Sequence, residues 1–136
     1  MRVAIALLVA VPLAAADIVV KVARPTPDWA WHQRSLGWLL LCLVVLACLL
    51  LLLRVPSVLV PPAAGVLAGG VLGNALSAAW NGLEVPNPLV LEGSRAVVAF
   101  NLADVWVVTG LTALFSVIAV WLVRNRETLP LRRRTR

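Results

Sequence analysis

The sequence predicts an all-α integral membrane protein with four transmembrane helices, short external loops and both termini in the cytoplasm. Of its 136 residues, 62% are hydrophobic and 13% are charged, which leaves too little polar surface for a water-soluble domain of this length. The apolar residues also fall into runs of the length that crosses a hydrocarbon layer of about 30 Å, roughly 20 helical residues. We therefore expect one compact domain whose principal partner is the lipid bilayer.

The predicted helices are separated by segments rich in proline, glycine or charged residues. Their expected ranges are 3–20, 36–53, 57–80 and 100–123, within a single domain over 1–136. The basic tail, 124–136, lacks apolar periodicity, so we expect it to contact anionic lipid and not nucleic acid.

The first apolar run contains a charged residue, Asp17, and Lys21 follows it four positions later. On a continuous helix the two side chains share a face and can neutralise each other. A secretory signal peptide cleaved before Asp17 is the alternative, because Arg2 precedes a short apolar stretch that ends in three alanines. The apolar pattern continues to Val20, which favours an uncleaved helix.

The segment between the first two helices is polar and carries Trp29 and Trp31, a composition typical of an interfacial loop. We expect His32 in this loop to be solvated and without a partner. The next run, 36–53, is nearly pure hydrocarbon and is expected to face lipid without carrying chemistry.

Two cysteines, Cys42 and Cys48, lie six residues apart in the second run. This spacing puts them on different faces of a helix, so we expect small buried hydrophobic residues and neither a disulfide nor a metal site.

The third helix carries glycine at every fourth position, at Gly65, Gly69 and Gly73, which predicts a face that another backbone approaches closely. Gly70 and Asn74 lie beside this stripe. The Asn74 amide must find a hydrogen-bond partner at membrane depth.

The fourth helix begins with an amide and a carboxylate, Asn101 and Asp104. The exposed N–H groups and the dipole at a helix start favour an acid there, so an N-terminal cap and a chemical site are both open interpretations. The preceding segment, 81–99, is expected to be a second external loop or a re-entrant segment.

Arginine distribution sets the predicted orientation. If the four helices alternate, one side of the membrane receives most of the arginines: Arg2, Arg54, Arg124, Arg126 and the cluster at 132–136. This side is predicted to be cytoplasmic. Four polar residues then converge on the external membrane face: Asp17, Asn74, Asn87 and Asp104.

Three motifs together resemble the lipoprotein signal peptidases (signal peptidase II). They are Asp-(x)3-Lys at 17–21, GGVLGN at 69–74 and FNLAD at 100–104. This family consists of four-helix aspartic endopeptidases that remove signal peptides from prolipoproteins in the bacterial cytoplasmic membrane. We expect no cofactor and no metal. The resemblance implies a catalytic role for Asp104, substrate-binding roles for Asn101, Asn74 and Asn87, and structural roles for Asp17, Lys21, Gly70 and Gly73.

The chain departs from the family pattern at the second acid. A two-acid peptidase needs one ionised carboxylate to activate water and one protonated carboxyl to polarise the scissile carbonyl. The family's Gly-Asn-x-x-Asp-Arg is replaced by a segment ending in Ser77 and Ala78, and Asn87 stands at or next to the place of the first catalytic acid. The first external loop is also too short for the family's β-rich cradle.

Three functional hypotheses follow. The first is an active aspartic endopeptidase that uses Asp104 with a substitute acid, Glu84 or Asp17. The second is a noncatalytic relative that binds a lipidated peptide, a lipid or a partner membrane protein. The third is a small transporter or channel subunit with a polar path through the membrane, although the repeats and paired broken helices common in transporters are missing from the sequence.

Overall fold

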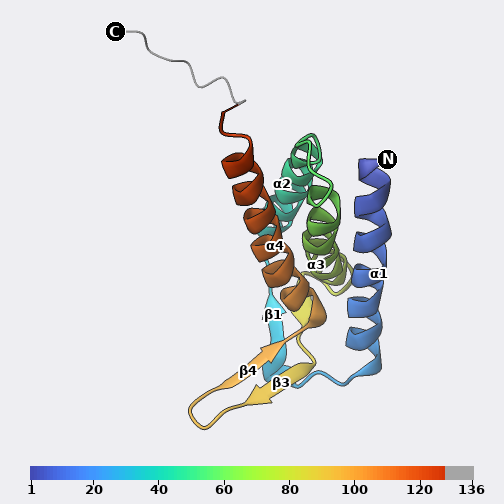
Figure 1. The fold of residues 1–136 in the computed structure, drawn as a ribbon. Coiled ribbons are helices and arrows are strands. Elements are labelled where there is room, and N and C mark those ends of the chain that lie inside the picture. Colours follow the sequence, from blue (N-terminus) through green and yellow to red (C-terminus); the bar gives the residue numbers. More distant parts are fainter. Residues whose placement is uncertain (128–136) are drawn as a thin grey trace.

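The computed structural model describes residues 1–127 and consists mainly of four helices that lie side by side (Figure 1). Their bounds are α1 Arg2–Ala23, α2 Leu36–Leu52, α3 Val60–Trp80 and α4 Leu102–Arg124. Each predicted boundary lies within three residues of the observed one. The start of α1 and the end of α4 lie at one end of the bundle, and the strands lie at the other.

Three of the described helices, α1, α3 and α4, are long and apolar enough to cross a membrane, judged by length and composition. Helix α2 is also apolar but has only 17 residues. These helices support the predicted membrane location. The number of crossings and the side on which the termini lie remain predictions.

The loops contain β structure, so the expectation of an all-α chain was wrong there. After a short 3-10 turn, Asp28–Ala30, strand β1 (Trp31–Gln33) pairs antiparallel with β2 (Glu84–Pro86). Strands β3 (Leu89–Glu92) and β4 (Val97–Phe100) form an antiparallel hairpin.

The expectation that the first loop is too short for such structure overlooked long-range pairing. β1 has three residues, and its partner β2 is about fifty positions away in the sequence. Local periodicity carries no signal for a strand of this kind, because its hydrogen bonds depend on a distant segment.

Helix α3 occupies the centre of the bundle and packs against the other three helices. In the most apolar 18-residue stretch of α3, 61% of the residues are buried inside the protein, compared with 22% in α1 and 11% in α4. The outer helices thus present most of their apolar surface outward, as helices in lipid do. α3 is the scaffold against which the site is built.

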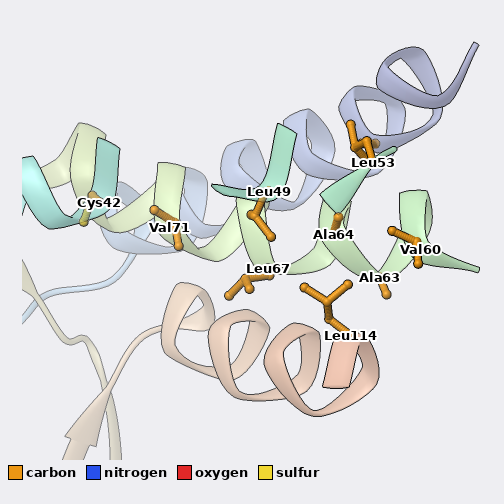
Figure 2. Close-up of a cluster of buried hydrophobic side chains, with 10 residues drawn as sticks. Cys42, Leu49, Leu53, Val60, Ala63, Ala64, Leu67, Val71 and Leu114 are labelled. Carbon is orange, nitrogen blue, oxygen red and sulfur yellow. The ribbon is translucent and has the colours of Figure 1, made fainter. Parts of the chain in front are cut away.

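The hydrophobic core lies along α3 (Figure 2). Leu67 of α3 and Leu114 of α4 point toward each other between the two helices, and Leu49 reaches the same cluster from α2. The prediction for the cysteines was half correct, because Cys42 is buried in this cluster whereas Cys48 is exposed.

The glycine stripe serves as a contact face, as predicted. A Cβ placed on Gly65 would lie 2.6 Å from the backbone oxygen of Ala6 in α1, and one on Gly70 would lie 2.5 Å from that of Ala103 in α4. Neighbouring faces of α3 therefore admit α1 on one side and α4 on the other at close backbone distance.

An arginine joins α1 to α2 at the end of the bundle away from the strands. Arg2 Nη1 donates hydrogen bonds to the backbone oxygens of Leu53, at 3.0 Å, and Val55. These carbonyls follow the last turn of α2, where backbone oxygens lack helical partners. Arg124 of α4 and Ser57, which follows α2, line one cavity at this end.

Candidate functional site

The site begins with the Asp17–Lys21 ion pair on α1, where Lys21 Nζ lies 2.6 Å from Asp17 Oδ2. The Asp17 side chain is fully buried, and that of Lys21 is only 3% exposed. Gly73 of α3 makes room for the pair, since a Cβ there would lie 2.7 Å from Asp17 Oδ2. The pairing predicted from the four-residue spacing is confirmed.

The second oxygen of Asp17 connects α1 to α4. Asp17 Oδ1 accepts a hydrogen bond of 2.8 Å from the backbone N–H of Ala103, in the first turn of α4. N–H groups in a first helical turn lack intrahelical acceptors, so a carboxylate from another helix satisfies one of them. Both oxygens of Asp17 are thus engaged.

Asn74 bridges the ion pair and the candidate acid. Its Oδ1 accepts from Lys21 Nζ at 2.9 Å, and its Nδ2 donates to Asp104 Oδ1 at 2.9 Å. The buried Asn74 amide therefore has a hydrogen-bond partner at its oxygen and another at its nitrogen, as predicted. The Asn74 side chain thus lies between the Lys21 ammonium and the Asp104 carboxylate.

Asp104 forms a reciprocal cap with Asn101 at the start of α4. Asn101 Oδ1 accepts from the Asp104 backbone N–H at 3.0 Å, and Asp104 Oδ2 accepts from the Asn101 backbone N–H at 3.2 Å. The capping interpretation is confirmed. Because each carboxylate oxygen accepts a hydrogen bond, the carboxylate is fixed in orientation at the helix start.

The network continues from Asn101 to the loops. Asn101 Nδ2 donates to Asn87 Oδ1 at 2.6 Å, and Asn87 Nδ2 lies 3.3 Å from the Ala99 backbone oxygen and 3.2 Å from His32 Nδ1. His32 thus has a partner, contrary to the expectation from sequence. The β1–β2 pairing places His32 opposite Val85, two residues before Asn87, which explains the contact.

Glu84, the predicted substitute acid, lies elsewhere. It is exposed on β2 and pairs with Gln33, while the residues that follow it, from Val85 to Asn87, are buried. Its hydrogen bonds to the rest of the chain are backbone contacts of the loop. Within residues 1–127, the structure joins Asp104 to three asparagines and does not bring Glu84 to them.

Two cavities border Asp104, and within the described part of the chain Asp104 is the one acidic residue that lines either of them. The first, of about 250 Å³, lies among α2, α3 and α4. Its lining is Arg34, Trp38, Leu41, Cys42, Val45, Val71, Asn74, Asp104 and Val107. The second, of about 320 Å³, is lined by Phe100, Asp104, Val105, Val108 and Thr109.

The first cavity brings residues of α2 and its preceding segment next to Asp104. Helix α2 was expected to face lipid without carrying chemistry, and two of its residues, Trp38 and Cys42, line the cavity beside Asp104. Sequence reasoning also missed Arg34, whose guanidinium carbon lies 5.1 Å from the centroid of the Trp38 ring. The four-residue spacing across the start of α2 was the available signal for this cation–π contact.

Replacement of Asn101 by alanine is expected to lower stability by about 0.5–2 kcal/mol, the usual cost of losing a helix cap. The substitution also removes the donor to Asn87 Oδ1, which is buried and would lose its hydrogen bond to this side chain. Thermal unfolding in detergent measures the change. Ser35→Ala, which removes the exposed cap of α2, is the matched control and should cost less, because it disrupts no second amide.

Comparison with known proteins identifies the fold. No family model and no curated protein matches the sequence. A solved structure described as a bacterial membrane enzyme is similar over 91% of this chain and 90% of its own, with a TM-score of 0.64 and 17% sequence identity. The chain therefore has the fold of a helical membrane enzyme, and at this identity the likeness is one of fold alone.

Proposed function

We propose that this chain is a divergent relative of the signal peptidase II family, located in a bacterial cytoplasmic membrane, that binds a lipid-modified peptide beside Asp104 without hydrolysing it. The observation that carries the proposal is the set of hydrogen-bonding side chains around Asp104, which within residues 1–127 are asparagines and include no second acid. The Asp104 side chain contacts Asn74 and Asn101, and Asn87 lies one hydrogen bond further along the same network.

Hydrolysis by two carboxyl groups has little support in this arrangement. Asp17 is fully buried, with one oxygen on Lys21 and the other on the Ala103 N–H. Glu84 is exposed on β2. An asparagine donates and accepts hydrogen bonds but does not exchange a proton with substrate, so Asn87 does not replace an acid.

The cavities support binding of an amphiphilic ligand. Their walls are mainly apolar, from Leu41, Val45 and Val71 on one side of Asp104 to Val105 and Val108 on the other. Acyl chains or apolar side chains fit such walls, and the remaining acceptor capacity of the carboxylate suits a peptide N–H. A lipid-modified peptide at the membrane surface has both properties, because it offers acyl chains to the apolar walls and backbone N–H groups to the carboxylate.

The test measures binding and cleavage of a fluorescent, diacylglyceryl-modified prolipoprotein peptide by the purified protein, beside an active family member. We expect binding without cleavage, and Asp104→Asn should weaken binding by about tenfold, which corresponds to 1.4 kcal/mol. Glu84→Gln is the control and should leave binding unchanged. Cleavage by the unmodified chain that is lost in both variants would establish a rebuilt two-acid site and overturn the proposal.

A second candidate is a peptidase that is inactive because it lacks one of its two acids. The position of Asn87, one hydrogen bond away from Asn101 beside Asp104, favours it. In an Asn87→Asp variant, the second carboxyl oxygen would take the place of the amide nitrogen, which lies 3.3 Å from the Ala99 oxygen and 3.2 Å from His32 Nδ1. We expect the variant to cleave the peptide at a measurable rate where the unmodified chain shows no cleavage, since general acid–base groups contribute about 10²–10⁴-fold. Asn87→Asp combined with Asp104→Asn is the control and should stay inactive. Unchanged cleavage in the single variant would reject this candidate.

A further inference from the structure

The β3–β4 hairpin has one wholly apolar face. In an antiparallel pair, directly opposed residues project to the same face, and alternate residues along each strand share it. The pairs Leu89–Phe100 and Leu91–Val98 therefore make one face, and Val90–Ala99 and Glu92–Val97 make the other. The second face carries the charge of Glu92.

Much of the apolar face is uncovered by the described residues. Leu91 is 63% exposed and Val98 is 54% exposed. An isolated two-stranded hairpin is marginally stable in water, and exposed large side chains add a further cost there. The tip between the strands is polar, with Ser94 and Arg95.

This face runs into the outward surface of α4. Phe100, at its inner end, lines a cavity with Val105 and Val108 of α4, and Val108 is 66% exposed. The hairpin leaves the bundle beside the start of α4 and extends away from the other helices (Figure 1). The apolar face is thus continuous with helix surface that lies in lipid if α4 spans the membrane.

We infer that the β3–β4 hairpin rests on the bilayer surface, with Leu89, Leu91, Val98 and Phe100 inserted at the interface and Glu92 directed to water. We choose the lipid surface as the partner of this face because the face is continuous with α4. If the apolar surface of α4 lies in hydrocarbon, the hairpin begins at the level of the lipid headgroups. The charge of Glu92 lies on the face away from the bilayer in this arrangement, while the opposite face carries apolar side chains alone. The inference does not depend on the proposed peptide binding.

Two neighbouring positions on β4 provide the test. Val97 and Val98 are equally exposed, at 54% each, but project from opposite faces of the strand. In a chain with Cys42→Ala and Cys48→Ala, Val97→Cys and Val98→Cys are each labelled with an environment-sensitive fluorophore. The proteins are reconstituted in vesicles of phosphatidylethanolamine and phosphatidylglycerol that contain spin-labelled lipid.

We expect a blue-shifted emission and at least about twofold stronger quenching by spin-labelled lipid at position 98 than at position 97. Unquenched, water-like emission at both positions would overturn the inference, as would equal quenching at both. Protection at position 98 that appears only as protein density in the vesicles rises would indicate a second copy on this face and would also overturn it. Neither label alters a buried side chain of the hairpin, so folding does not limit the comparison.

Discussion

Replacement of Asp17 by alanine is expected to destabilise the protein by about 3–5 kcal/mol, the cost of leaving a buried charge without its partner. Lys21 would keep its hydrogen bond to Asn74 but lose the carboxylate 2.6 Å away. The Ala103 N–H at the start of α4 would lose its acceptor at the same time. Unfolding in mixed micelles of detergent and dodecyl sulfate, followed by circular dichroism, measures the change.

The double variant Asp17→Ala/Lys21→Met separates the two contributions. Removing both charges together should recover the part of the lost stability that is due to the unpaired Lys21 charge, because apolar replacement of a buried pair is often close to neutral, whereas the Ala103 N–H still lacks its acceptor. Asp28→Ala, an acid exposed in the first loop, is the matched control and should change stability by less than about 0.5 kcal/mol. A single Asp17→Ala variant as stable as the unmodified protein would contradict the buried pair.

Replacement of Gly110 by alanine is expected to separate α3 from α4 and to cost at least about 1–3 kcal/mol. A Cβ at this position would lie 2.6 Å from the Cα of Leu67, a backbone atom that no rotamer change can move away. Because Leu67 and Leu114 fill the same helix interface, the added methyl group also disturbs the core beside it (Figure 2). The midpoint of unfolding in detergent reports the loss.

Gly37→Ala on α2 is the control for helix propensity. Its Cβ would meet Ser35 Oγ at 3.7 Å, an ordinary van der Waals distance. Alanine favours a helix by about 0.8–1 kcal/mol over glycine, so this variant should be neutral or more stable. Equal destabilisation by the two substitutions would show that the close approach at Gly110 is not the cause.

The elements of the site that sequence could predict are those encoded at short range. A four-residue spacing was sufficient to pair Asp17 with Lys21, and a three-residue spacing was sufficient to cap α4 with Asn101 and Asp104. The need of Asn74 for a partner followed from its depth in an apolar helix, although the identity of the partners did not. The helices themselves followed from hydropathy, because lipid requires every span to satisfy its own backbone.

The elements that sequence could not predict depend on contacts between distant segments. β1 and β2 become strands only through each other, and the contact of His32 with Asn87 follows from that pairing. Glu84 was a candidate because of its charge and its nearness in sequence to Asn87. The segment between them is extended, so a separation of three residues leaves Glu84 exposed while Asn87 is buried. The cavity beside Asp104 needed the packing of three helices, which no single run of sequence describes.

The bond between Asp17 and the Ala103 N–H has a consequence for the assembly of the protein. α1 is synthesised first, and the opposite charges of Asp17 and Lys21 already lie on one helix face, so the two charges near its end can neutralise each other before the other helices follow. Most of the chain must follow before the Ala103 N–H exists to donate its hydrogen bond to Asp17 Oδ1. The carboxylate of Asp17 in α1 thus gains its second partner only when the last helix is in place, which links the burial of this acid to the docking of α4.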